Sequence, residues 1–309
     1  MTVEIEKPLT VTVCVPCIPF QREEDLQKCL KYINEQSVTP IQLLVMSTFD
    51  PMINAIEEAV KEATGDIFIL VDDDSDIPQN NWIQCILNDF QKSKDIAYVG
   101  GSVTQRALTE SEFEKHLVEV QNSFLGFFLM SRRYSARHRK FSTNPDPETL
   151  IAMGGYRTEF LKSAFAQIDF HDISGAWENI VFRFFQKSGK ILIYDPMVSY
   201  FHRPRNSPAS YARQIFGYGK GRAFYFRHYP NDLLRKPYFL LPSILLVTMI
   251  PGIIWPVPVF GLYLVAILGG SMVTFRQSSV VSALTKAGLI VITHLAYGLG
   301  FLKGLIFGK

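Results

Sequence analysis

Four aspartates lie within five consecutive residues, directly after a short apolar run. The apolar run covers residues 67–71, and the aspartates are Asp72, Asp73, Asp74 and Asp76. Alternation along an extended chain puts Asp72 and Asp74 on one side, where their charges repel unless a cation is present. Carboxylate oxygens suit Mg²⁺ or Mn²⁺, which can bind phosphate oxygens on their other face. The run predicts a metal site formed by Asp72, Asp74 and Asp76, in preference to a solvated turn with a helix-capping Asp76.

Other residues could act together with a metal-bound phosphate. His202 follows an apolar stretch, and a neutral imidazole can ligate Mn²⁺, although a lone histidine is more often structural. Arg213 and Arg222 lie in a segment rich in glycine and aromatic residues, and their planar forks suit diphosphate oxygens. Arg132 and Arg133 belong to a second basic cluster. Both groups of arginines could instead bind lipid headgroups.

The chain before residue 237 alternates apolar runs with stretches of helical spacing. Strands are expected at residues 11–15, 41–46 and 67–71, with helices at 23–36 and 53–63 between them. This order predicts βαβ units and an α/β sheet. In such sheets ligands bind beyond the carboxyl ends of the strands, which is where the aspartates lie. Further along, residues 112–133 have the spacing of one long amphipathic helix.

The order of these features resembles the family 2 glycosyltransferases over residues 11–230. The resemblance rests on Pro16 after the first strand, the Asp-x-Asp of Asp72 and Asp74, Gly154-Gly155-Tyr156-Arg157, and the segment from Trp177 to His202. Residues 211–222 resemble members that act on lipid-linked acceptors at a membrane. The resemblance implies the GT-A fold, which is a Rossmann-like mixed sheet flanked by helices. It also implies a nucleotide-sugar donor, a divalent cation and inversion at the anomeric carbon.

The resemblance and the arginines together give a set of candidate site residues. The candidates for donor binding are Pro16, Asp50, Asp72, Asp73, Arg213, Gln214 and Arg222. The candidates for acceptor binding are Gly155, Tyr156, Trp177, Arg132 and Arg133. His202 joins the aspartates as a candidate metal ligand. The second expected strand ends in Val45 and Met46, where many members carry acidic residues that contact the nucleoside. The nucleotide therefore stays open between GDP, UDP and others, and mannosyl and glucosyl transfer are both compatible.

An inverting transfer needs a base that takes the proton of the acceptor hydroxyl. Glu178, at the start of an expected helix, is the first candidate, and Asp172 is the second. The alternative is that Glu178 only favours the helix N-terminus electrostatically. An acceptor that is a lipid phosphate is already ionised and needs no base. In that case Glu178 would be structural or orienting.

The C-terminal part of the chain has the composition of a membrane segment. Residues 237–275 carry no charged side chain, and prolines near their middle favour a helical hairpin. A third apolar helix, expected at residues 287–307, could cross the bilayer or lie at its interface. Arg276 and Lys286 bracket a polar linker that fits a cytoplasmic loop. We therefore expect a catalytic domain at residues 1–236, a membrane domain at 237–309, and an integral protein of the cell membrane.

The overall composition limits the classes of partner and the cellular location that we expect for the protein. The formal net charge of the 309 residues is +2, which gives no indication of a nucleic-acid partner. The N-terminal residues MTVEIEKPLT are polar and acidic, so we expect no signal peptide and a cytoplasmic catalytic domain. The pair Cys14 and Cys17 has no second cysteine pair to form a zinc site, and both are expected as small core residues. The oligomeric state stays open.

Two other functions compete with the transferase. A nucleotidyltransferase could share the sheet and the acidic site, but it usually carries a glycine-rich loop after its first strand. Residues 17–20, Cys-Ile-Pro-Phe, are not such a loop. A non-catalytic membrane adaptor would tolerate the loss of Asp74 or Glu178, and both are present. The prediction is a transferase whose acceptor is amphiphilic, because each CH₂ group extracted from a bilayer costs about 0.8 kcal/mol.

Overall fold

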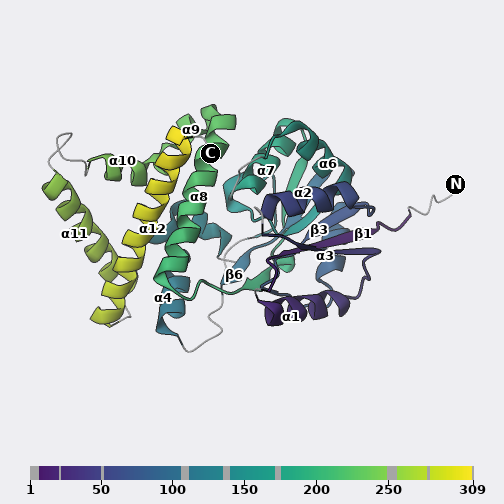
Figure 1. The fold of residues 1–309 in the computed structure, drawn as a ribbon, viewed down its shortest axis with the longest axis horizontal. Helices are drawn as coiled ribbons and strands as arrows, with labels where there is room; N and C mark the ends of the chain where they lie inside the picture. Colours follow the sequence, from purple (N-terminus) through teal and green to yellow (C-terminus); the bar gives the residue numbers. More distant parts are fainter. Residues whose placement is uncertain are drawn as a thin grey trace. The chain divides into compact units, whose positions relative to one another are not determined.

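The computed structural model describes residues 7–20, 22–49, 52–105, 111–134, 140–170, 175–248, 256–276 and 279–307. Contacts divide the chain into two compact units (Figure 1). The first unit comprises Met1–Val103, Ala136–His171 and Val181–His202. The second comprises Thr104–Ser135, Asp172–Ile180 and Arg203–Lys309. The sequence suggested one boundary at residue 236, whereas the contacts group several earlier segments with the apolar C-terminal part.

The first unit is built on a seven-stranded sheet with the order β2-β1-β3-β8-β5-β9-β7. Its strands are β1 (Val11–Cys17), β2 (Gln42–Ser47), β3 (Ile67–Leu70), β5 (Ile96–Gly100), β7 (Ser142–Thr143), β8 (Gly154–Arg157) and β9 (Ile191–Tyr194). Strand β1 runs parallel to β2 and β3, and β9 runs parallel to β5. Strand β8 is antiparallel to both of its neighbours, β3 and β5. The sheet is therefore mixed, as expected.

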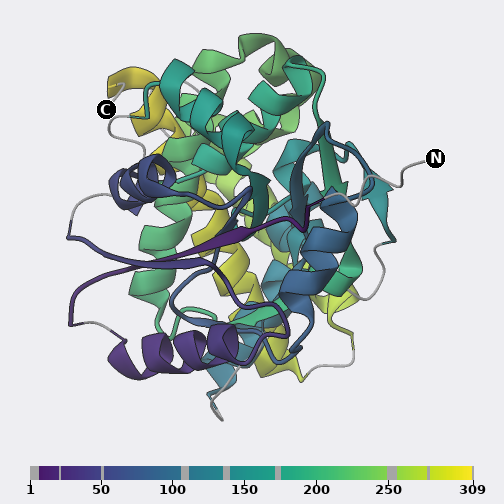
Figure 2. The same cartoon turned by 90° about the vertical axis from the view of Figure 1, so that its right-hand side faces the viewer.

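Helices cover the faces of this sheet. They are α1 (Glu23–Asn34), α2 (Met52–Glu62), α3 (Trp82–Phe90), α6 (Thr158–Gln167) and α7 (Trp177–Lys187), with short 3₁₀ turns at Pro147–Thr149 and Pro196–Val198. Figure 2 shows α1 and α2 on opposite sides of β1. Strands β1 and β3 are buried at every position, as their unbroken apolar runs predict. Strand β2 forms one edge of the sheet and is partly exposed.

The cysteines of β1 are core residues, as expected. Cys14 is fully buried and Cys17 is 4 % exposed. Burial raises the pKa of the Cys14 thiol to about 12, and the neighbouring Cys17 adds to the shift. A thiol with so high a pKa stays protonated and is a poor nucleophile and metal ligand. All four cysteines of the chain are free.

The second unit is helical. Its elements are α4 (Glu112–Gln121), α5 (Phe124–Phe127), a 3₁₀ helix η1 (Phe128–Arg133), α8 (Pro208–His228), α9 (Pro230–Arg235), η5 (Pro237–Leu240), α10 (Leu241–Thr248), α11 (Pro256–Thr274) and α12 (Val280–Phe307). The expectation of one helix over residues 112–133 is wrong. The helix stops at Gln121, and the Ser123 hydroxyl accepts a hydrogen bond from the Gly126 amide (3.0 Å), which starts a new turn. Phe128 then adopts a positive φ of 49°.

The apolar C-terminal part contains one helix in the described residues that is long and apolar enough to cross a membrane. This helix is α12, and it begins at Val280, before the expected start at residue 287. Half of its most apolar window is buried inside the protein. The region expected as a hairpin contains the shorter apolar helices Pro237–Thr248 and Pro258–Thr274. The break between them, residues 249–255, which includes Pro251 and Gly252, lies outside the described residues.

Helices α8 and α12 lie side by side along much of their length (Figure 1). A Cβ atom on Gly300 of α12 would lie 2.0 Å from the Phe216 carbonyl oxygen of α8. In the same way, a Cβ atom on Gly219 of α8 would lie 2.2 Å from the Tyr297 carbonyl oxygen. Only glycine allows two helix backbones to approach so closely.

Candidate functional site

The turn after β3 carries the aspartates of the predicted metal site. The Val71 amide donates a hydrogen bond to the Cys14 carbonyl (3.0 Å), so the chain remains hydrogen-bonded to β1 as far as Val71, directly before Asp72. Asp73 and Asp74 form a turn that leads into β4 (Ser75–Asp76). A small second sheet has the order β4-β10-β6, in which β10 is Tyr200–His202 and β6 is Val103–Gln105. Its antiparallel register pairs Ser75 with His202.

This register brings two predicted metal ligands together. Asp74 Oδ1 lies 2.9 Å from His202 Nε2, and the two side chains are 6 % and 15 % exposed. These residues are far apart in the sequence, and the β4–β10 pairing is what joins them. The result is a carboxylate oxygen and an imidazole nitrogen side by side in a largely buried position at the carboxyl end of β3.

Two basic side chains from α1 and its start also contact the aspartates. Arg22 forms an ion pair with Asp74, and its Nη1 atom lies 3.6 Å from Asp73 Oδ1. Lys28 Nζ lies 2.7 Å from Asp76 Oδ1. Burial raises the pKa of Asp73 to about 6; the charge of Asp74 adds to this shift and Arg22 opposes it. The acidic cluster is therefore partly neutralised by the protein's own cations.

The fit of this cluster to a divalent cation rests on the Asp74–His202 pair. The carboxylate of Asp76 is engaged by Lys28, and no group of three or more His, Cys, Asp or Glu residues that could hold a metal occurs in the described part of the chain. A single carboxylate and one imidazole suit a cation such as Mn²⁺ when phosphate oxygens and water complete its coordination. Asp72, two residues before Asp74, lies just beyond the end of β3 and is half-buried.

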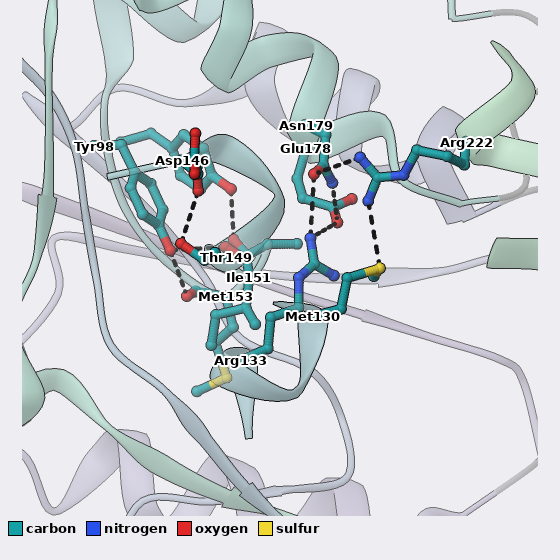
Figure 3. Close-up of polar contacts among 12 residues, drawn as sticks. Tyr98, Met130, Arg133, Asp146, Thr149, Ile151, Met153, Glu178, Asn179 and Arg222 are labelled. Carbon is teal, nitrogen blue, oxygen red and sulfur yellow. Dashed lines mark hydrogen bonds and ion pairs between the residues drawn. The ribbon is translucent and has the colours of Figure 1, made fainter. Parts of the chain in front are cut away.

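The segment before β8 is fixed beside the aspartate turn. The Tyr98 hydroxyl donates hydrogen bonds to the carbonyls of Ile151 (2.7 Å) and Met153 (3.1 Å), as Figure 3 shows. The Ser75 hydroxyl in turn donates to the Met153 sulfur (3.3 Å). Gly154 has a φ of 151°, and a Cβ atom there would lie 2.6 Å from the Val99 carbonyl oxygen. Glycine is required at this point.

Two predicted acceptor residues, Gly155 and Tyr156, are core positions of β8. Tyr156 is fully buried, its ring stacks on Phe182, and its hydroxyl donates to the Ala152 carbonyl (2.5 Å). A Cβ atom on Gly155 would lie 2.5 Å from a side-chain carbon of Ile86. Neither residue presents a side chain that a soluble ligand could contact. The sequence alone does not show that the hydroxyl of Tyr156 is hydrogen-bonded to the backbone inside the core.

The other predicted donor and acceptor residues are dispersed. Pro16 is enclosed within β1. Arg132 and Arg213 are exposed, Gln214 is half-buried and Trp177 is buried, all in the second unit. Asp50, predicted to bind the donor, and Asp172, the second candidate base, lie outside the described residues.

Three predicted residues of the second unit meet in one buried cluster, shown in Figure 3. The Glu178 carboxylate accepts hydrogen bonds from Arg133 Nη2 (3.0 Å) and from the Asn179 side-chain amide (2.7 Å). The Asn179 side-chain oxygen accepts from both Arg133 Nη2 and Arg222 Nη1, each at 3.3 Å. Glu178, Arg133 and Arg222 are 6 %, 8 % and 1 % exposed.

Among the described residues, this cluster holds two arginines and one carboxylate. Burial lowers the pKa of the Arg133 guanidinium, but the charge and hydrogen bond of Glu178, together with Tyr134 and Tyr218, outweigh burial, so the pKa is raised overall. The Glu178 oxygen Oε1 serves both donors, which ties this carboxylate to its own unit. Both hydrogen bonds fall on Oε1, and no hydrogen bond to Oε2 occurs among the described residues, so this arrangement is compatible with an orienting role and with a base. Asn179, which joins the two arginines, belongs to the segment that carries the family resemblance but was not among the candidate site residues.

The comparisons with known proteins establish the fold. No protein-family model matches the chain, and no curated protein sequence is detectably similar to it. Among solved structures it is similar to the mannosyltransferase PcManGT from Pyrobaculum calidifontis, in complex with GDP-Man and Mn²⁺. The TM-score is 0.54 at 14 % identity, over 98 % of this chain and 89 % of that chain.

Two weaker similarities have TM-scores below 0.5 and bear on neither fold nor function. One is a mannosyl-3-phosphoglycerate synthase from Rubrobacter xylanophilus, with a TM-score of 0.43, 13 % identity, and coverage of 72 % of this chain and 75 % of that chain. The other is a mycobacterial protein, with a TM-score of 0.42, 11 % identity, and coverage of 71 % and 74 %. The mixed sheet and its similarity to the mannosyltransferase show that this chain has the GT-A fold.

Proposed function

We propose that this chain is a metal-dependent, inverting glycosyltransferase that moves a sugar from a nucleotide-sugar donor to an amphiphilic acceptor at a membrane. The observation that carries the proposal is the Asp74–His202 pair at the carboxyl end of β3 in a GT-A sheet. Mannose from GDP-mannose is the first donor to test, because the similar solved structure is a mannosyltransferase bound to GDP-Man and Mn²⁺.

The first unit would hold the donor's diphosphate. Asp74 and His202 would ligate a divalent cation, which when bound offsets the charge that develops on the leaving diphosphate. Arg22 already contacts Asp74, and about a third of its side chain is exposed. It is therefore able to exchange its carboxylate partner for a phosphate oxygen, a contact to which the guanidinium fork is well suited.

The second unit would hold the acceptor. Its apolar helices, above all α12, give it surface that suits a bilayer, in which an amphiphile can stay while it reacts. Glu178 would orient Arg133 through their ion pair. This role agrees with an acceptor that is already ionised and gives up no proton.

The test is binding of nucleotides, followed by sugar transfer. Isothermal titration of the full-length protein with GDP, UDP and ADP, each with and without Mn²⁺, should give metal-dependent binding of one nucleotide. The corresponding sugar nucleotide should then label a lipid extract. Asp74→Asn should abolish both signals, while Asp95→Asn, which changes an exposed aspartate paired with Lys190, should leave both intact. Nucleotide binding that is absent, or that is indifferent to Mn²⁺ and to Asp74, would contradict the proposal.

A further inference from the structure

The loop directly before β8, in the first unit, is held by two buried tyrosines. The Tyr98 hydroxyl donates to the carbonyl of Ile151 (2.7 Å) and also to that of Met153 (3.1 Å), as Figure 3 shows. The Tyr156 hydroxyl donates to the carbonyl of the residue between them, Ala152 (2.5 Å). Three successive carbonyls of this loop are therefore bound by side chains that come from the sheet.

The position of the Tyr98 hydroxyl is itself tightly confined. A Cβ atom on Gly100 would overlap the hydroxyl oxygen, and a Cβ atom on Gly154 would lie 3.0 Å from it. The Tyr98 ring is fully buried, and its centre lies 4.9 Å from that of Tyr156 and 4.4 Å from that of Phe182. Two glycines make room for the hydroxyl and two rings fix its direction, so it meets the loop carbonyls at one defined place.

The same loop contacts the aspartate turn through one side chain. The Ser75 hydroxyl donates a hydrogen bond to the Met153 sulfur (3.3 Å), and both side chains are 1 % exposed. Ser75 directly follows Asp74, and its amide donates to the Asp72 carbonyl (3.1 Å). The strand register also pairs Ser75 with His202. Ser75 therefore connects the loop to both candidate metal ligands.

The pairing that brings these ligands together is short. Strand β4 comprises only Ser75 and Asp76, so its antiparallel register with β10 contains two residue pairs. Asp74 lies in the turn before β4, outside this ladder. Ligands of a metal must be held within about 0.5 Å of their working positions by the groups around them. A two-residue ladder gives little rigidity by itself, so the contact of Ser75 with the loop adds needed support.

We infer that Tyr98 is a positioning residue that keeps Asp74 beside His202. It acts through Met153 and Ser75, because its hydroxyl fixes the loop and the loop fixes the turn. The inference rests on the proposed function and deepens it, since it concerns how the metal ligands are held in place before a metal binds. Tyr98 takes part in no bond that forms or breaks.

The first measurement is hydrogen–deuterium exchange of the metal-free, full-length protein in detergent. Tyr98→Phe keeps the buried ring and removes only the hydroxyl. Amides of residues 71–76 and 150–154 should exchange about threefold or more faster in this variant, because local opening of the loop and the turn becomes easier. Amides of β1 and β2 should exchange as in wild type. Wild-type exchange rates at residues 71–76 would overturn the inference.

The second measurement is the affinity for Mn²⁺, alone and with GDP, from the electron paramagnetic resonance signal of free Mn²⁺. Tyr98→Phe should weaken binding about tenfold, the lower end of the usual effect of losing a residue that orients metal ligands. Tyr225→Phe is the matched control. It also removes a buried hydroxyl, which donates to Asp232 (2.6 Å) in the second unit, and it should leave the Mn²⁺ affinity unchanged. Equal effects of the two variants would overturn the positioning role.

A double-mutant cycle tests the path through Ser75. Ser75→Ala removes the hydroxyl that contacts Met153, and it should weaken Mn²⁺ binding by a similar factor. If both variants break one path, the double variant should bind about tenfold more weakly than wild type, whereas independent effects would multiply to about a hundredfold. Multiplied effects would overturn the inference. Met153→Leu, which removes the sulfur at similar volume, gives the same comparison if Tyr98→Phe does not fold.

Asp74→Asn separates this inference from the proposed function. If Asp74→Asn abolishes Mn²⁺ binding while Tyr98→Phe leaves it unchanged, the inference fails and the metal site stands. If wild type and Asp74→Asn bind Mn²⁺ equally, the metal site of the proposed function fails, and the positioning role fails with it. All affinities are measured well below the unfolding midpoint of each variant, so that folded molecules are compared.

Discussion

The carboxylate of Asp74 contacts both His202 and Arg22, so under the proposed function it is the carboxylate of the acidic cluster whose loss should lower activity most. We expect Asp74→Asn to lower kcat/KM for sugar transfer by about 10²–10³-fold, the usual effect of removing one electrostatic group from a reacting centre. Asp95→Asn is the control, since Asp95 is exposed and pairs with Lys190. Transfer by Asp74→Asn within a few-fold of wild type would exclude Asp74 from the metal site.

Arg22 forms an ion pair with Asp74, so under the proposed function it would compete with a cation for this carboxylate. Removing it should therefore strengthen metal binding in the absence of nucleotide. We expect Arg22→Ala to bind Mn²⁺ about two- to fivefold more tightly, because the lost ion pair is partly exposed and worth little. Titration calorimetry with Mn²⁺ alone measures this. Lys31→Ala, which removes an exposed lysine paired with Glu35 on the adjoining helix, should leave the affinity unchanged. Weaker Mn²⁺ binding in Arg22→Ala would show that Arg22 supports the site instead of competing for it.

Glu178 can be tested as an orienting residue or as a base. Breaking its buried pair with Arg133 should cost about 3–5 kcal/mol, so Glu178→Gln should unfold at a clearly lower temperature. Adding Arg133→Gln should recover part of that loss, because it removes the unpaired charge. Among molecules that remain folded, transfer should stay within about tenfold of wild type, whereas losing a true base costs about 10²–10⁴-fold. Thermal unfolding and single-turnover rates give the two readouts.

The sequence could indicate some of these residues and not others. The aspartates could be recognised from the sequence because all four lie within five residues directly after an apolar run, so no distant part of the chain is needed to bring them together. Arg22 reaches Asp74 across 52 positions, and no sequence pattern announces that contact. Tyr156 was expected near the acceptor because its segment resembles the acceptor-side region of the family, yet the Ala152 backbone carbonyl accepts its hydroxyl hydrogen bond inside the core. Pairings that depend on register, such as that of Ser75 with His202, need the fold itself.

At the scale of elements, the pairing of α8 with α12 depends on glycine. We expect Gly300→Ala to destabilise the protein by about 1–3 kcal/mol, the usual cost of overpacking, because the new methyl group would meet the Phe216 carbonyl. Gly288→Ala on the same helix is the matched control, since nothing lies within 4 Å of a Cβ atom there. Because alanine has a higher helix propensity than glycine, Gly288→Ala should stabilise α12 by up to about 1 kcal/mol. Thermal unfolding in detergent measures both, and equal effects would contradict the close packing.

The elements themselves were predictable where one signal dominates. Strands β1 and β3 are unbroken apolar runs between breakers, and the structure has both. The helix expected over residues 112–133 shows the limit of periodicity. Its spacing persists, but Ser123 caps a new turn and ends the old one, a local hydrogen bond that apolar spacing does not encode. The sequence suggested that Lys286 ends a polar linker. In the structure Lys286 lies within α12, which begins at Val280, and it is buried and paired with Glu119.

For the whole molecule, the proposed membrane attachment makes the outer face of α12 meet lipid. We expect the protein to stay with membranes after an alkaline wash. Leu299, which is 52 % exposed on α12, is a direct probe of that face. Leu299→Lys should reduce the retained fraction, since a lysine in the bilayer centre costs about 2.5–3.5 kcal/mol. Leu234→Lys, at an 80 % exposed residue of α9, is the control. Full recovery of wild type in the wash, or no effect of Leu299→Lys, would place α12 against water.

The close contact between α8 and α12 also affects how the chain is made. Helix α8 leaves the ribosome well before α12, so the face of α8 that contains Gly219 has no partner helix while the intervening helices are synthesised. Contacts between segments distant in sequence form late and expose apolar surface until then. During synthesis α8 therefore stays without its partner helix for longer than β1 stays without β2 and β3, which pair within the first part of the chain to be made.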